Sequence, residues 1–269
     1  MNRRRANEVD KIETEPMPRL NILGVGISPI TMQDALDRIS SWIENGARQY
    51  VSVCVVHTIM ECQYSETIRR AVNGAGMATP DGMPLVWLGK WRSQVKVSRV
   101  YGPDLMLALC QLSITRGYSH YFYGGASGVP ELLAQKLTNR FPGLKIAGTY
   151  SPPFRPLTPE EDAQIVEQIN QSKPDIIWVG LGTPKQDLWM ASHRQQLTAP
   201  VLIGVGAAFD FHTERIPQAP TWMQQAGLEW LFRLWQEPKR LWYRYLVYNP
   251  LFVLSILAQI LKLKQYSIE

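Results

Sequence analysis

Short apolar runs alternate with helix-like segments along most of this chain. The apolar runs predict strands at 21–27, 50–56, 120–123, 144–149, 175–180 and 201–205. Helical spacing and end signals predict helices near 31–44, 65–74, 104–116, 129–140 and from 158 onward. Such βα alternation is typical of a parallel sheet wrapped by helices, so the sequence predicts an α/β fold with a compact Rossmann-like parallel sheet flanked by helices.

The helix starts carry recognisable capping residues. Thr31 is followed three positions later by Asp34, a capping-box arrangement in which Asp replaces the usual Glu or Gln. Thr158 precedes Pro159 and two acids, and Pro130 stands near the first turn of another helix. These signals fix where helices begin better than where they end.

Glycine pairs follow or end four of the predicted strands. They are Gly24 with Gly26, Gly124 with Gly125, Gly180 with Gly182, and Gly204 with Gly206. Ligands of parallel sheets bind beyond the carboxyl ends of the strands, where glycine lets backbone amides approach a phosphate. The pattern favours a nucleotide or nucleotide-sugar ligand, although glycines also serve plain tight turns. None of the four completes a Walker A motif or a GxGxxG fingerprint with its ribose-binding acid.

The composition changes after Pro220. Seven aromatic residues gather there: Trp222, Trp230, Trp235, Trp242, Tyr243, Tyr245 and Tyr248. Basic residues outnumber acids between 222 and 264, and residues 251–261 are almost wholly apolar but too short to span a bilayer. This predicts a C-terminal aromatic and basic helical appendage lying on an anionic membrane surface. A helix packed on the body or on a second subunit is the alternative.

Three domains are expected: a disordered basic and polar N-terminus at 1–18, an α/β domain at 19–220, and the helical appendage at 221–269. Hydrophobic residues make up 45% of the 269 and charged residues 19%, which suits a globular protein with a sizeable core. The arginines at the N-terminus are not followed by an apolar stretch, so no secretory signal is predicted. Cys54, Cys62 and Cys110 lack metal-ligand spacing and are expected to be reduced, which indicates a cytosolic compartment.

Two charged residues near the middle of the chain are candidates for chemistry. Asp81 stands in a Pro-Asp-Gly turn expected between helical segments. It is either a plain turn acid or a general base that deprotonates a sugar hydroxyl. Arg99 is either a diphosphate ligand, through bidentate contacts, or a solvated surface residue.

Two later loops offer polar groups at strand ends. Between a strand and a helix, Lys185 could meet a phosphate and Gln186 a sugar hydroxyl, unless this is only a helix start. Asp210, flanked by two phenylalanines, either holds a ribose or base edge or caps a turn. His57 after a buried strand is more simply explained as a structural histidine.

No Asp-x-Asp motif for a cation on a diphosphate is present, and no metal ligand set is predicted. Cationic side chains would then neutralise a leaving diphosphate. Arg233, Arg240 and Arg244 of the aromatic segment are the natural supply.

Six stretches, taken in order, resemble the WecG/TagA/CpsF family of glycosyltransferases (family 26). They are TPDGMPLVW (79–87), RVYGPDL (99–105), FYGGASGVPELL (122–133), WVGLGTPKQDLWM (178–190), GVGAAFDF (204–211) and GLEWLFRLWQEPKR (227–240). The resemblance implies a metal-independent, inverting transfer from a UDP-sugar to a polyprenyl-diphosphate-linked sugar, without a cofactor. The transferred sugar would be N-acetylmannosamine, a uronic acid or a related hexose, in cell-surface or exopolysaccharide synthesis.

The resemblance also assigns residues. Asp81 matches the family's general base, Gln186 its pocket glutamine and Asp210 its nucleotide-side acid. Arg99 matches the arginine ahead of a Gly-x-Asp helix. Arg233 and Arg240, with Arg244 one position beyond the expected spacing, match arginines of a membrane-seeking C-terminal segment. With glycines 124, 125 and 182 and Lys185, these residues form the expected substrate site. The enzyme is expected as a peripheral protein on the cytoplasmic face of the membrane, with no nucleic-acid partner and with homo-oligomers possible.

The chain departs from the family pattern in the second predicted strand and in the Gln186 loop. Val53 and Val55 stand where the family usually has Thr-x-Asn, so that a polar donor contact is either missing here or supplied by His57 or Thr58. Asp187 stands where Glu is usual. Two other functions are compatible with parts of the chain: a nucleotide-binding oxidoreductase using a glycine turn, and a non-catalytic membrane adaptor.

Overall fold

Residues 17–268 are described in the computed structural model of the chain. Most of the N-terminal segment 1–18, for which disorder is predicted, therefore lies outside the described residues.

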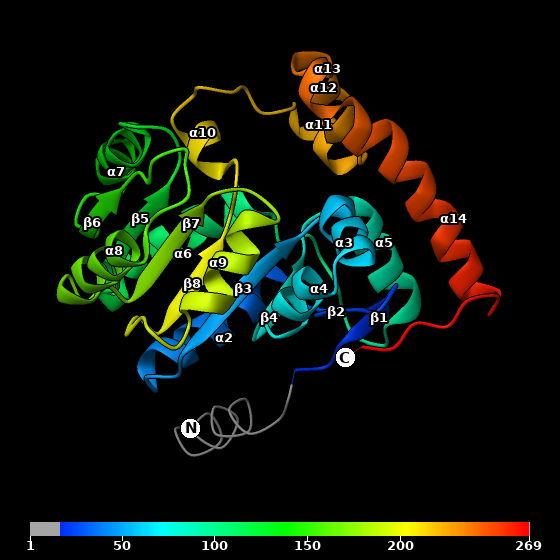
Figure 1. The fold of residues 1–269 in the computed structure, drawn as a ribbon, viewed down its shortest axis with the longest axis horizontal. Coiled ribbons are helices and arrows are strands. Elements are labelled where there is room, and N and C mark those ends of the chain that lie inside the picture. The colour runs from blue at the N-terminus through cyan, green and yellow to red at the C-terminus, as the bar shows by residue number, and fades with distance from the viewer. Residues whose placement is uncertain (1–16, 269) are drawn as a thin grey trace.

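A six-stranded, wholly parallel sheet forms the centre of the molecule (Figure 1). Its strands, in spatial order, are β4 (Met77–Pro80), β3 (Gln49–Cys54), β8 (Val201–Gly204), β7 (Ile176–Gly180), β5 (Ser119–Gly124) and β6 (Lys145–Tyr150). The chain runs outward from β3 to β4 and, on the other side, from β5 to β6, and β7 and β8 fill the space between. The predicted α/β fold with a parallel sheet is confirmed. The crevice at such a change of direction is where ligands of this fold class bind.

Helices cover both faces of the sheet. One face packs against α2 (Met32–Glu44), α6 (Gly102–Arg116), α7 (Val129–Arg140) and the short α10 (Ala208–His212). The other face packs against α8 (Pro159–Gln171) and α9 (Lys185–His193). The predicted capping box is present, since Thr31 and Asp34 bond reciprocally at the start of α2. The predicted capping residue Thr158 also begins α8, where it forms a second capping box with Glu161.

The predicted strand at 21–27 is wrong, because this segment is a hairpin. Strands β1 (Leu20–Ile22) and β2 (Val25–Ile27) pair antiparallel in a sheet of their own. Leu23 and Gly24 between them both have positive φ, 53° and 80°, the geometry of a two-residue turn that reverses the chain. The turn packs against the C-terminal residues, because Tyr266 O accepts a hydrogen bond of 2.6 Å from Asn21.

Strand β4 was not predicted from the sequence. Its four residues are all buried, so they show no alternation of polar and apolar positions. Asp81 therefore follows a strand of the central sheet and does not lie between two helices. This places its carboxyl at the carboxyl edge of the sheet.

The C-terminal helical segment, residues 221–268, runs from α11 (Thr221–Gln225) through α12 (Glu229–Gln236) and α13 (Pro238–Trp242) to a π-helical turn, η1 (Tyr243–Val247), and α14 (Tyr248–Ile260). Figure 1 shows α14 running along the flank of α3 (Val56–Tyr64) and α5 (Met83–Arg92). Tyr248, Phe252 and Ile256 of α14 join a core cluster with α3, α4 (Glu66–Asn73) and the hairpin. Within the described residues, no helix has the length and apolarity needed to cross a bilayer.

Candidate active site

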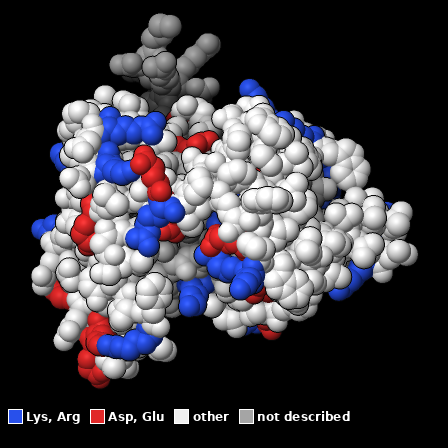
Figure 2. Space-filling model, turned by 90° about the horizontal axis from the view of Figure 1, so that it is seen from above, with Lys and Arg blue, Asp and Glu red and all other residues white. Residues whose placement is uncertain are grey.

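A cleft of about 1090 Å³ opens at the carboxyl ends of the parallel strands. Segments that follow β3, β4, β5, β7 and β8 contribute to its walls, and the C-terminal helical segment closes one side. Figure 2 views the molecule from above and shows Lys and Arg side chains, with acids beside them, in the middle of this face and over the half away from the C-terminal helices. Toward the side that carries the C-terminal helices, the same face is largely uncharged.

The predicted site residues converge on this cleft with one exception. Its lining includes Asp81, Arg99, Gly125, Gly182, Lys185, Gln186, Asp210, Arg233, Arg240 and Arg244. Gly124 does not line it: a Cβ there would lie 2.6 Å from the carbonyl carbon of Gly180, so this glycine allows β5 and β7 to approach. Gly24 and Gly26 also lie elsewhere, in the hairpin beside residues 266–268. The glycine pattern therefore mixes cleft residues with packing residues.

Asp81 is buried at the floor of the cleft, and Arg99 holds it in place. The guanidinium donates from Nη2 to Asp81 Oδ1 at 3.1 Å and from Nε to the Asp81 backbone oxygen at 2.7 Å. Oδ2 accepts a hydrogen bond of 3.2 Å from the Gly102 amide at the start of α6. Only 6% of Asp81 is exposed, so few water molecules compete with a ligand in the cleft for contact with its carboxyl group.

Burial raises the pKa of Asp81 to about 6. The positive charge of Arg99 and the Gly102 amide oppose this rise, and the negative charge of Glu229 adds to it. A carboxyl that titrates near 6 is ionised at neutral pH and is a stronger base than an exposed aspartate. Burial at the cleft floor and a pKa near 6 are properties that a general base requires.

Gln186 is held rigidly at the first turn of α9. Its Oε1 accepts a hydrogen bond of 3.1 Å from the Gly182 amide. Gly204 gives it room, because a Cβ there would lie 3.0 Å from Nε2. Only 2% of Gln186 is exposed, so its side-chain amide has little freedom to move within the cleft wall.

Three arginines of the C-terminal helical segment line the opposite wall. Glu237 pairs with Arg240 at 2.5 Å and more loosely with Arg233 at 3.7 Å. Burial lowers the pKa of Arg244. The buried Nε atoms of Arg233 and Arg244 find no hydrogen-bond partner within the described part of the chain. Buried cationic donors without partners favour an anionic ligand at this wall.

Comparison with known proteins shows which protein family the chain belongs to. A family model described as "Glycosyl transferase WecG/TagA/CpsF family" matches residues 20–266. The chain belongs to the WecG/TagA/CpsF family of glycosyltransferases. It is therefore a glycosyltransferase, and the oxidoreductase and adaptor alternatives are set aside.

Two curated relatives carry the same name, N-acetylglucosaminyldiphosphoundecaprenol N-acetyl-beta-D-mannosaminyltransferase. The protein from Bacillus spizizenii is 28% identical over 197 residues, which are 73% of this chain and 74% of the relative. The protein from Bacillus subtilis is 28% identical over 188 residues, which are 70% of this chain and 71% of the relative.

The valines that depart from the family pattern lie in the glycosyltransferase cleft. Val53 and Val55 both line it, as does His57 in the first turn of α3. Burial first, and then the charge of Arg244, lower the pKa of His57 to about 3, so its ring is neutral at pH 7. His57 thus lies on the cleft wall, as the departure from the family pattern suggested, although its local sequence favoured a structural histidine.

Asp187 lies beneath the cleft of the glycosyltransferase, not in it. It is fully buried and accepts a hydrogen bond of 2.6 Å from Ser52 Oγ in β3. Burial raises its pKa to about 6.

Sequence reasoning missed two groups of the glycosyltransferase site. Glu229 and Tyr101 complete the contacts around Arg99, and the proline-rich segment 152–157 lines the cleft. Glu229 and Tyr101 had available signals, since they lie in the family-like stretches 227–240 and 99–105, and Glu229 is one of few acids in an aromatic and basic segment. The segment 152–157 had none beyond its prolines.

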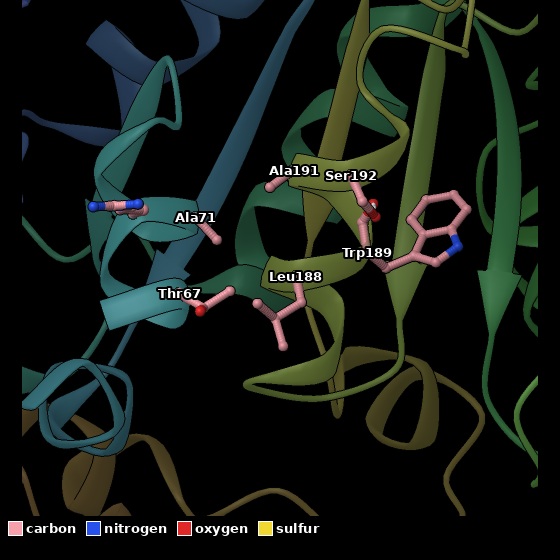
Figure 3. Close-up of a pocket in the computed structure, with 7 residues that line it drawn as sticks. Thr67, Ala71, Leu188, Trp189, Ala191 and Ser192 are labelled. Atoms are coloured by element: carbon pink, nitrogen blue, oxygen red, sulfur yellow. Dashed lines mark hydrogen bonds between the residues drawn. The ribbon is translucent and has the colours of Figure 1, made fainter. Parts of the chain in front are cut away.

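A second, shallower depression of about 540 Å³ lies between α4 and α9. Figure 3 shows Thr67 and Ala71 of α4 facing Leu188 and Ala191 of α9 across it. Its lining is mostly apolar and includes none of the residues around Asp81. The candidate catalytic residues therefore lie in the larger cleft and not in this depression.

Proposed function

We propose that this glycosyltransferase moves a hexose-type sugar, such as N-acetylmannosamine or a uronic acid, from a UDP-sugar to a polyprenyl-diphosphate-linked sugar. The names of the two curated relatives support this acceptor class and an N-acetylmannosamine donor. The observation that carries the proposal is Asp81, a buried carboxyl with a raised pKa at the floor of a cleft walled by arginines.

The proposed reaction is a single displacement with inversion at the anomeric carbon. The acceptor hydroxyl oxygen forms a bond to C1 of the donor sugar, and its proton passes to a carboxylate oxygen of Asp81. The bond from C1 to the diphosphate oxygen breaks, and UDP leaves with both bonding electrons. Asp81 then releases its proton to solvent. A base tuned to titrate just below neutral pH suits this role.

The arginines support the leaving-group side of the proposal. Arg233, Arg240 and Arg244 would neutralise the diphosphate, as a cation does in metal-dependent transferases. Within residues 17–268, no cluster of three or more His, Cys, Asp or Glu side chains could hold a metal ion. Lys185 would contact a phosphate, Gln186 a sugar hydroxyl, and Asp210 the ribose or base. We assign no donor contact to Val53 or Val55.

A donor panel tests the proposed function. UDP-N-acetylmannosamine, its uronic acid and UDP-glucuronic acid are each incubated with a short-chain polyprenyl-diphosphate-GlcNAc, in EDTA. Release of UDP is expected with one of them, and NMR of the product is expected to show the inverted anomeric configuration. Release only after a divalent cation is added, or a product with retained configuration, would contradict the proposed mechanism.

We also propose that the C-terminal helical segment binds peripherally to an anionic membrane on its cytoplasmic face. Leu254 and Leu257 of α14, and Leu261 directly after it, share one exposed face, opposite the buried residues of this helix. Trp235 is 88% exposed, and Lys262 and Lys264 follow the helix. An apolar face with aromatic and cationic neighbours matches an interfacial helix.

Substituting the exposed face of α14 tests membrane binding. The double variant Leu254→Glu/Leu257→Glu is expected to weaken flotation with phosphatidylglycerol vesicles by about 10-fold or more, because it places two charges in the acyl boundary. The matched control, Ile114→Glu/Leu132→Glu, changes exposed apolar residues of α6 and α7 and should bind as the wild type does. Equal binding by both double variants would show that α14 is not the membrane contact.

A further inference from the structure

Glu229, to which the sequence analysis gave no role, completes the charge cluster around Asp81. Its Oε2 accepts a hydrogen bond of 2.7 Å from Arg99 Nη2, and its Oε1 accepts one of 3.0 Å from the Tyr101 hydroxyl. The side chain is 17% exposed, so both contacts are largely shielded from water. The Arg99 guanidinium also lies over the Tyr101 ring, 3.9 Å from its centroid.

The same nitrogen of Arg99 serves two carboxylates. Nη2 lies 3.1 Å from Asp81 Oδ1 but 2.7 Å from Glu229 Oε2, so the closer partner is Glu229. Nε is bonded to the backbone oxygen of Asp81. Arg99 therefore cannot form the two-pronged pair with the Asp81 carboxylate that would make this carboxylate a poor base.

Glu229 reaches this position from a segment distant in the sequence. It opens α12, 130 residues after Arg99. The turn before it approaches α5 closely, because Gly227 has φ of +73° and a Cβ there would lie 2.8 Å from Trp87. A side chain larger than glycine at this position would require Trp87 or the turn before α12 to shift.

We infer that Glu229 is a positioning residue for the proposed transfer: it holds Arg99 between two carboxylates and leaves Asp81 free to accept the proton of the acceptor hydroxyl. The catalytic part of this inference rests on the proposed function. The effect of Glu229 on the pKa of Asp81, however, can be measured without any substrate.

The direction of the effect follows from the charges that face Asp81. Arg99 and, more distantly, Arg244 are the cations, and Glu229 and the exposed Asp104 are the acids, with the neutral Tyr101 hydroxyl between. Removing the negative charge of Glu229 lowers the pKa of Asp81, because the ionised form loses a repulsive neighbour. Asp81 is then the only carboxylate that Arg99 Nη2 pairs with, and this closer pairing lowers the pKa of Asp81 further.

The experiment measures the titration of Asp81 directly. The full-length protein is labelled with carboxyl ¹³C in its aspartates, and the Asp81 signal is assigned from its loss in Asp81→Asn. Wild type is expected to titrate near 6. Glu229→Gln is expected to lower the midpoint by about one pH unit, and the acid limb of kcat should move down equally. At pH 8 kcat should fall about threefold, since a weaker base transfers protons more slowly.

Asp104→Asn is the matched control. It removes one negative charge from the same neighbourhood, but Asp104 has no hydrogen bond to Arg99 or Asp81 in the structure, so the midpoint should move by less than about 0.3 pH units. Glu229→Asp keeps the charge but is too short for both contacts, so a smaller fall is expected. It serves as the second variant if Glu229→Gln unfolds.

The outcomes separate this inference from the proposed function. An unchanged or raised midpoint in the folded Glu229 variants, or a fall equal to that of Asp104→Asn, overturns the positioning role even if the enzyme is active. A lowered midpoint in a protein that transfers no sugar would support the role of Glu229 in setting Asp81 and overturn the proposed reaction.

Discussion

Replacing Asp81 by asparagine is expected to lower kcat by about 10²- to 10⁴-fold. Asparagine keeps the size of the side chain and can still accept a hydrogen bond from Arg99 or Gly102, but it cannot take the proton of the acceptor hydroxyl. The measurement is steady-state UDP release with the best donor of the panel. Binding of UDP, followed by calorimetry, should persist within about threefold, since the loss lies in the chemical step.

Stability provides a control for this variant. The folded-state pKa of Asp81 lies above the usual value of 3.8, so its carboxylate disfavours the folded state once pH rises through the interval from about 4 to about 6. Asp81→Asn should therefore unfold at pH 8 at a temperature no lower than wild type. The exposed Asp104→Asn should keep wild-type turnover. Full turnover by Asp81→Asn would show that Asp81 is not the base.

Replacing Arg99 by methionine is expected to remove activity at neutral pH and to destabilise the fold by about 3–5 kcal/mol. Methionine preserves much of the aliphatic volume, but Asp81 and Glu229 then face each other with no cation between them. The pKa of Asp81 rises further, so the base is protonated where wild type is ionised. The acid limb of kcat should move to higher pH, opposite to the shift expected for Glu229→Gln.

Arg99→Lys separates charge from geometry. Lysine keeps the cation but cannot bond the Asp81 backbone oxygen and both carboxylates as the guanidinium does. Its stability and acid limb should lie between wild type and Arg99→Met, as measured by urea unfolding and pH–rate profiles. If Arg99→Met shows a wild-type acid limb, Arg99 does not set the basicity of Asp81.

Local chemistry made much of the fold predictable. The helix starts at Thr31 and Thr158 were correct because a capping residue and its partner lie three positions apart in the chain. The buried strands β3, β5, β7 and β8 were predicted because a run of apolar residues between turn signals usually forms a strand. The more exposed edge strand β6 was also predicted. Reading 21–27 as one strand failed because apolarity does not reveal the two positive φ angles at Leu23 and Gly24.

Most members of the candidate site were predictable from the sequence, but their contacts were not. By itself, the sequence determined the α/β fold and the motifs that carry Asp81, Arg99, Gln186 and Asp210. Only the tertiary structure decided that Gly124 serves packing, that His57 lies on the cleft wall, and that Glu229 reaches Arg99 across 130 residues. Capping and strand formation depend on neighbours in the chain, whereas the partner of a buried charge depends on how distant segments pack, which no local pattern records.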